Sequence, residues 1–366
     1  MNIAFLVTEQ NKPYEGVVRP FLNFAKGMKG IEKAWLALFR CGPKIISYVN
    51  DIDVPSCVLS SKSELIKETE DRRTDFIICD DSFLNLGMLN SFKKKIRAKI
   101  VVYVQVLYGV HAISGCFDLS YLPIKEKAIF SLSRFIPFSL LIRKYRSFLN
   151  NCNAIIANSN ATAGILQTLY GINVNGVVYP PTDTEIFKPI SRTLNPKDIM
   201  FYLGSHAGDT QASHVKHIID RLHEGNYTIN LFGTQKLAAI LKRRHPKLAY
   251  HQNIEDKYLA ELYSKSLLTI CPQKWELFGY VQVESMSCGT PVLSFDCMGP
   301  AETIVNLKTG WMAKSRQEFL RILNSILENE ESMIDQNSVR KHVKKNFSVN
   351  VSAKKLDEAL RAIING

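Results

Sequence analysis

Short apolar runs recur along almost the whole chain, and helical stretches separate many of them. Most of these runs are apolar at every position instead of at alternate positions, which is typical of strands buried on both faces of a parallel sheet. Helices between such strands supply the crossover connections that parallel strands require. The pattern therefore predicts an α/β chain built on doubly wound parallel sheets.

The series of strands is interrupted once and then restarts. Residues 186–198 carry prolines and polar side chains, which indicates a linker between two domains. Before the linker we predict strands at 2–7, 34–39, 45–49, 76–80, 99–104, 153–158 and 176–181. After it we predict strands at 198–204, 227–233, 248–251, 267–272 and 291–295, and helices at 211–223, 235–244, 255–265, from about 279, and near 316–328.

A length of 366 residues also favours two domains over one. We predict a first domain over 1–190, a second over 191–350, and a terminal amphipathic helix over 351–366, capped by Ser352, that packs back toward the first domain. Ligands of doubly wound sheets bind at the carboxyl ends of the strands. Two such domains facing each other would enclose a cleft.

The composition of the chain restricts the cellular compartment and the binding partners that we expect for it. The apolar stretch Ile3–Val7 has no basic region before it, so we interpret it as a first strand and not as a signal peptide. The eight cysteines form no C-x-x-C pair and no zinc-type cluster, which favours reduced thiols in a cytoplasmic protein. The net charge of +12 favours an anionic partner. No nucleic-acid recognition motif accompanies that charge, so we expect no nucleic-acid partner.

The most informative segment is 271–295. An apolar strand ends at Cys271, a loop carries Glu276, and Phe278-Gly279 opens a helix that carries Glu284 eight residues after Glu276. The glycine leaves the helix N-terminus accessible to a phosphate. The first carboxylate would then lie beside a sugar, and the second would accept hydrogen bonds from a ribose.

Each glutamate also has a plainer interpretation. A Glu before a helix is most often a solvated capping residue, and Glu284 could be a surface residue. However, Glu284 lies between Val283 and Met286 in an otherwise apolar helix, and a carboxylate there needs a partner. This favours a ligand-binding role.

These residues resemble a known family. The run Glu276-Leu277-Phe278-Gly279 through Glu284, followed by Cys288-Gly289-Thr290-Pro291, is similar to the E-x7-E segment of the retaining GT-B glycosyltransferases, also called group 1 or family 4-like, which include sucrose synthases and lipid-linked mannosyltransferases. Residues 153–172, 177–189, 299–312 and 339–360 resemble other segments of that family.

The resemblance implies a fold and a set of roles. The fold is GT-B, with two Rossmann-like doubly wound domains facing across a cleft, the first binding the acceptor and the second the nucleotide sugar. The implied catalytic residues are Glu276, Gly16 and His111, and the implied donor-binding residues are Glu284, Phe278, Gly279, Tyr280, Gly204, Ser205 and Lys216. No metal and no cofactor beyond the nucleotide-diphosphate sugar is implied.

The chain departs from the family pattern at three places, of which the first is the N-terminal glycine loop, reduced here to the single Gly16. The family's Gly-Arg and its Lys six residues after that Arg hold the diphosphate, whereas this chain has Gly204-Ser205 and Gln211 there. Lys216, His206 and His214 are the nearby candidates to replace those cations. The family's His after the strand at 99–104 is replaced by Gln105, with His111 six residues on.

A second segment points to a membrane surface. Residues 121–150 contain six cations, one acid and several large apolar side chains. Such a stretch can lie on an anionic bilayer. Alternatively, it is a pair of helices packed on the first domain with solvated charges.

We therefore predict a metal-independent retaining hexosyltransferase that moves a sugar from a nucleotide-diphosphate donor to a glycan or lipid-linked acceptor. We expect it in the cytoplasm, on the inner face of the membrane if residues 121–150 bind there. The alternatives are a non-catalytic GT-B subunit, which the missing cations favour, and a nucleotide-sugar epimerase on the same fold.

Overall fold

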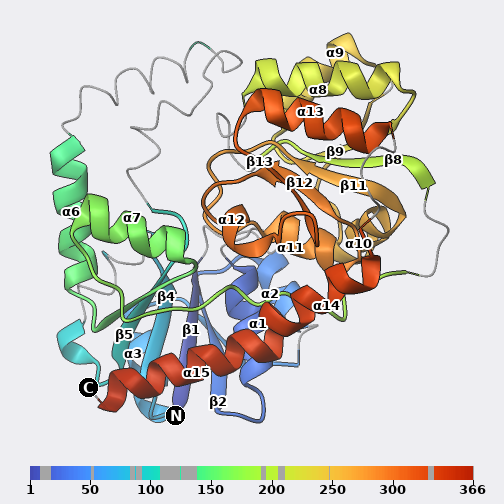
Figure 1. Ribbon diagram of the computed structural model, residues 1–366. Helices are drawn as coiled ribbons and strands as arrows, with labels where there is room; N and C mark the ends of the chain where they lie inside the picture. The colour runs from blue at the N-terminus through green and yellow to red at the C-terminus, as the bar shows by residue number, and fades with distance from the viewer. Residues whose placement is uncertain are drawn as a thin grey trace. The chain divides into compact units, whose positions relative to one another are not determined.

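The computed structural model describes residues 1–8, 18–50, 53–82, 87, 93–107, 124, 138–190, 195–204, 211–246, 248–328 and 334–365. It contains two parallel sheets with helices between their strands (Figure 1). The described chain divides into two compact units. The first unit takes its residues from 1–111, 136–182 and 347–366, and residues 183–346 lie in the second.

The first unit has a sheet of order β3-β2-β1-β4-β5-β6-β7. Its strands are β1 (Asn2–Thr8), β2 (Lys33–Phe39), β3 (Ser56–Leu59), β4 (Phe76–Asp80), β5 (Lys99–Val104), β6 (Ala154–Ala157) and β7 (Gly176–Val177). Its helices are α1 (Arg19–Met28), α2 (Pro43–Asn50), α3 (Lys62–Asp71), the 3-10 turn η1 (Lys93–Lys95), α6 (Phe138–Asn150), α7 (Asn160–Tyr170) and α15 (Val349–Asn365).

The second unit has a sheet of order β10-β9-β8-β11-β12-β13. Its strands are β8 (Asn195–Tyr202), β9 (Thr228–Phe232), β10 (Ala249–His251), β11 (Ser266–Cys271), β12 (Val292–Phe295) and β13 (Gly310–Ala313). Its helices are α8 (Ala212–Glu224), α9 (Gln235–Arg244), α10 (Asp256–Lys265), α11 (Tyr280–Ser287), α12 (Pro300–Thr303), α13 (Arg316–Leu327) and α14 (Gln336–Asn346). Helices α8, α9 and α13 cover one face of the sheet and α10 to α12 the other, as Figure 1 shows.

The doubly wound α/β class predicted from the sequence is confirmed for both units. Every strand pair of the two sheets is parallel, for example β1 with β2 and β4, and β11 with β8 and β12. The central strands are buried on both faces, because β1, β4 and β5 carry buried residues at consecutive positions. This burial explains why their sequences are apolar without alternation.

Two local predictions are wrong. Residues 45–49 form part of α2 and not a strand, since only Ile45 and Val49 are buried there and a spacing of four places both on one helical face. Ser352 does not cap α15. The helix begins at Val349, and Ser352 is a buried residue of its first turns whose N–H donates to the Ser348 carbonyl.

Helix α15 belongs to the first unit and lies against α1. A Cβ added at Gly27 of α1 would lie 2.7 Å from the Ala353 Cβ and 2.9 Å from the Val349 carbonyl oxygen. The two helix backbones therefore approach so closely that only glycine fits between them. An ion pair between Arg361 and Glu32 adds a second connection between the C-terminal helix and the β1–β2 region.

The described part of the chain holds no helix that is both long and apolar enough to span a membrane. The described cysteines all have free thiols.

Candidate functional site

The strand order marks one place in each sheet where a ligand site is expected. In the second unit β8 is followed by β9 on one side, whereas β11 pairs with β8 on the other side. The order of the strands thus reverses between β8 and β11, and ligands of doubly wound sheets bind outside the carboxyl ends of such strands. The residues that follow β8 and β11 are therefore the first candidates for a site.

The backbone after β8 is shaped by two glycines. Gly204 has a φ of +88° and Gly233, after β9, has a φ of +105°, values that favour glycine. A Cβ at Gly233 would lie 2.6 Å from the Gly204 carbonyl oxygen, which accepts the Thr234 N–H at 2.9 Å. The Gln273 side chain, beyond β11, donates to the Tyr202 carbonyl at 2.8 Å and joins the ends of the two strands.

Beyond β11, the chain forms a loop that ends at the start of α11. The N-cap of this helix is Gly279, with a φ of +97°, and no side chain caps the helix. The Glu276 carboxylate turns back toward the helix and accepts the Gly279 N–H at 3.2 Å. Because the first N–H groups of a helix have no partner within the helix, this terminus attracts negative charge. Glu276 is partly exposed at this terminus.

Glu284 lies in the second turn of the same helix and is only 2% exposed. The helix is held rigidly around it. The Ser285 hydroxyl donates to the Thr290 carbonyl and shares a hydrogen bond with the Thr269 hydroxyl of β11. The Arg340 guanidinium, from α14, donates to the Ser287 carbonyl at 2.6 Å. The two glutamates therefore occupy fixed positions relative to the strand ends.

A hydrogen bond and close packing contacts fix the loop before α11. The Gly299 N–H donates to the Glu276 carbonyl at 2.9 Å. A Cβ at Gly299 would lie 2.4 Å from the Phe278 Cα, so only glycine permits this contact. The Phe278 ring is buried and meets the Tyr280 ring edge-on at 5.2 Å. Residues 299–303 thus fix the backbone that carries Glu276.

The structure brings together some of the predicted site residues. Glu276, Phe278, Gly279, Tyr280 and Glu284 share one loop and one helix, and Gly204 ends the neighbouring β8. Lys216 lies half-buried on α8, and the contacts of the described residues do not connect it to α11. Gly16, His111, Ser205 and His206 lie outside the described residues.

His214 does not replace the absent cations. Its ring packs between Phe295 and Phe319 in the core of the second unit, with centroid distances of 5.8 and 5.3 Å. Burial lowers its pKa to about 4, so the ring is neutral at pH 7. His214 is a candidate replacement only because it is close in the sequence to the positions of the family's cations.

Sequence reasoning missed Asp81, which follows β4 where the strand order of the first sheet reverses. Its carboxylate is fully buried. It accepts the backbone N–H groups of Gln105, Val106 and Leu107 and the hydroxyl of Tyr145, at 2.9, 3.2, 2.9 and 2.7 Å. Burial raises the pKa of this carboxyl. Asp81 thus anchors the loop after β5. The sequence feature that could have identified it is an acidic residue at the end of an apolar strand.

Sequence reasoning also missed Gln282 of α11, which is fully buried. Its signal was the same as that of Glu284: a polar residue at a buried position of an apolar helix.

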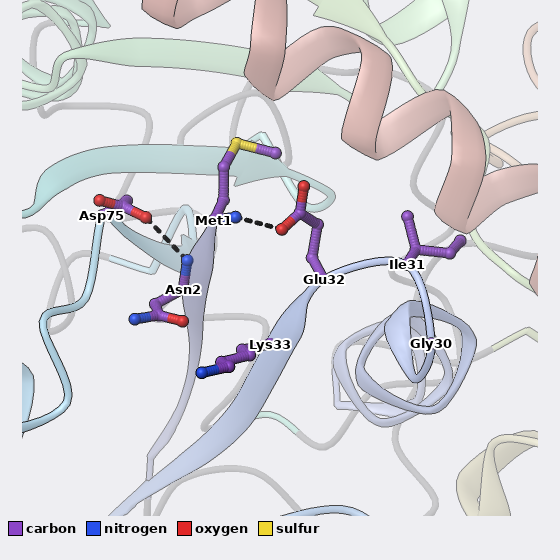
Figure 2. Close-up of a pocket in the computed structure, with 7 residues that line it drawn as sticks. All are labelled: Met1, Asn2, Gly30, Ile31, Glu32, Lys33 and Asp75. Carbon is purple, nitrogen blue, oxygen red and sulfur yellow. Dashed lines mark hydrogen bonds and ion pairs between the residues drawn. The ribbon is translucent and has the colours of Figure 1, made fainter.

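A pocket of about 530 Å³ lies elsewhere, beside the amino ends of β1 and β2 (Figure 2). Its walls carry an ion pair between the Met1 amino group and Glu32, and a hydrogen bond of 2.7 Å from the Asn2 N–H to Asp75. These polar groups already pair with one another. Because the pocket is at the amino ends of the strands, it does not coincide with the candidate site.

Comparison with known sequences agrees with this location. Residues 174–346, which include β8 to β13 and α11, match the model of the family described as "Glycosyl transferases group 1". The chain is 26% identical to the α-1,3/1,6-mannosyltransferase ALG2 of Kluyveromyces lactis, over 70% of this chain and 66% of that protein. It is 28% identical to a probable sucrose-phosphate synthase of Thermosipho melanesiensis, over 46% of this chain and 41% of that protein. The chain thus spans less than two thirds of the length of these relatives.

Comparison with solved structures concerns the fold. A glycosyltransferase of Rickettsia africae superposes with a TM-score of 0.74 at 16% identity, covering 100% of this chain and 99% of that one. Anabaena HepE, solved in complex with UDP-glucose, superposes with a TM-score of 0.75 at 17% identity, covering 99% and 100%. The fold is that of the GT-B glycosyltransferases, and residues 174–346 of this chain match the model of the group 1 glycosyltransferase family.

Proposed function

We propose that this protein is a retaining hexosyltransferase that takes its sugar from a nucleotide-diphosphate donor. The observation that carries the proposal is a pair of carboxylates, with Glu276 in the loop beside the N-terminus of α11 and Glu284 buried in the second turn of the helix. In support, HepE was solved with UDP-glucose, and ALG2 is a mannosyltransferase.

Each part of the site has a role in this reaction. The diphosphate lies at the N-terminus of α11, where the helix dipole and the N–H groups of the first turn offset the charge that develops on the leaving phosphate. Glu284 accepts hydrogen bonds from the ribose hydroxyls, and Glu276 lies beside the transferred sugar. No metal ion is needed for charge stabilisation in this scheme, and Gly204, Ser205 and Lys216 complete the donor site.

The first unit supplies the acceptor site in this proposal. The family resemblance assigns Gly16 and His111 to it, and Asp81 anchors the loop after β5 in the same unit. The acceptor in this proposal is a glycan or a lipid-linked sugar.

The same proposal places the protein in the cytoplasm, on the inner surface of a membrane. Helix α6 exposes Arg143, Lys144 and Arg146, with Leu140 52% exposed beside them, and no acid occurs between residues 138 and 150. Cations next to an exposed apolar side chain fit an anionic bilayer surface. The remainder of the 121–150 segment, apart from Ile124, lies outside the described residues.

A transfer assay tests the proposal. The full chain is incubated with radiolabelled UDP-glucose, UDP-galactose or GDP-mannose and a membrane extract as acceptor, with the Glu276→Ala variant as the control. We expect label in a glycan or lipid fraction with at least one donor, and far less with the variant. Absence of both transfer and hydrolysis with every donor would instead indicate a non-catalytic subunit. Interconversion of UDP-glucose and UDP-galactose would indicate an epimerase.

A further inference from the structure

Gln282 is the third residue of α11, and its side chain is fully buried. Within the part of the chain that the structure describes, neither its Oε1 nor its Nε2 has a hydrogen-bond partner. A buried amide that forms no hydrogen bond costs free energy, and native structures retain such groups mainly where function uses them. The amide therefore needs a further explanation.

The position of this amide is informative. A Cβ built on Gly279 would lie 2.8 Å from Gln282 Oε1 and 3.5 Å from Nε2, so the amide lies against the glycine that opens α11. Glu276 bonds to the N–H of the same glycine. Gln282 is thus at the helix terminus assigned above to the donor, where its amide occupies the room that a side chain at residue 279 would need.

The two unpaired atoms restrict what this ligand can be. A phosphate oxygen accepts hydrogen bonds and cannot donate one, so it would satisfy Nε2 and leave Oε1 unpaired. A sugar hydroxyl both donates and accepts, and a pair of neighbouring hydroxyls satisfies both amide atoms together. We propose that Gln282 binds hydroxyl groups of the transferred sugar and thereby contributes to the choice among donor sugars. This inference rests on the proposed function, because it takes a nucleotide sugar as the ligand of α11.

Isothermal titration of paired ligands tests the inference. The full chain and its Gln282→Met variant are titrated with UDP-glucose and UDP, and with GDP-mannose and GDP. Each pair differs only in the presence of the sugar. We expect the variant to bind the preferred nucleotide sugar about 3- to 10-fold more weakly, the effect of one or two lost hydrogen bonds. Its affinity for the matching nucleoside diphosphate should change less than about twofold, because the phosphate contacts remain.

Two further variants complete the test. Gln235→Met, at the exposed first residue of α9, makes the same chemical change away from the site and should leave every affinity unchanged. Gln282→Asn keeps the amide but shortens the side chain, and it should also lose affinity for the nucleotide sugar. The inference is overturned if both Gln282 variants keep the wild-type ratio between nucleotide-sugar and nucleotide affinities. If the wild-type chain binds none of the four ligands, the proposed function fails first and the inference falls with it.

Discussion

At the scale of single residues, the most informative feature is the buried carboxylate of Glu284 in α11. Glu284 is 2% exposed and lies between Val283 and Ser285, which are fully buried. Moving a carboxylate out of water costs several kcal/mol unless other groups replace its hydration. A ribose presents two neighbouring hydroxyl donors, and a carboxylate can accept both.

Replacing Glu284 by Gln removes one of the two acceptor atoms and the charge. Hydrogen bonds to charged groups contribute about 1.5–3 kcal/mol, so we expect affinity for UDP or GDP to fall about tenfold or more. Calorimetric titration measures this effect. Glu224→Gln, at an exposed position of α8, is the matched control. Equal nucleotide affinity in the Glu284 variant and in the wild type would contradict the ribose role.

Glu276→Ala should act differently, because this carboxylate is placed beside the sugar at the helix terminus. We expect kcat to fall by about 10²-fold or more, as for the loss of a group that stabilises charge in the transition state. Donor KM should change by less than about threefold. Initial-rate kinetics separate the two parameters. A variant with raised KM and unchanged kcat would indicate that Glu276 only helps to bind the donor.

Burial of His214 in the core of the second unit makes the stability of the protein depend on pH. Burial lowers its pKa from 6.5 to about 4, so the folded state keeps the ring neutral where the unfolded state already binds a proton. The contribution of His214 to the free energy of unfolding is therefore fully present above pH 6.5. It is lost as the pH falls toward 4, and the loss amounts to up to about 3 kcal/mol. Urea unfolding at pH 7.5, 5.5 and 4.5 measures this loss. His214→Phe should show a smaller loss over the same range, and an equal loss would mean that other groups cause it.

At the scale of elements, the sequence predicted most of the strands and helices. Strands β1, β4 and β5 and helices α9 and α13 lie where the sequence predicted them. The short β3 and β13 were missed, and α2 was predicted as a strand because its five residues 45–49 fit either period. The segment from β11 through α11 was predicted through its E-x7-E resemblance. The roles of Asp81 and Gln282 depend on tertiary contacts that no local pattern encodes.

Helix α6 carries the membrane prediction. Changing Arg143, Lys144 and Arg146 to Glu should abolish co-sedimentation with vesicles of phosphatidylglycerol and phosphatidylcholine at low salt. Each cation near an anionic surface contributes about 1 kcal/mol, so losing three weakens binding by about 10²-fold even before repulsion is counted. The matched control changes Lys341, Lys344 and Lys345 of α14, which are exposed on the second unit, to Glu. Equal losses in both variants would show that only total charge matters, and unchanged binding of the α6 variant would remove the support for this surface.

At the scale of the whole molecule, periodicity predicted two doubly wound sheets, and the structure shows both. Each unit has its own core, one around β1, β4 and β5 and the other around β8, β11 and β12. The predicted division of labour, with the acceptor on the first unit and the donor on the second, stays a prediction. A catalytic arrangement between units depends on their relative placement, which apolar patterns within each unit do not encode.

Metal dependence is a property of the complete enzyme, and it tests the electrostatic scheme. If the N-terminus of α11 offsets the charge on the departing diphosphate, no divalent cation has to bridge the phosphate oxygens. Transfer by the full chain should therefore keep more than about half of its rate after dialysis against EDTA. Added Mg²⁺ or Mn²⁺ should not raise the rate further. The assay uses a fixed donor and acceptor, and a metal-dependent glycosyltransferase treated in parallel shows that chelation is complete. Loss of transfer in EDTA with recovery on addition of Mn²⁺ would mean that a metal ion, and not the helix terminus, carries the leaving-group charge.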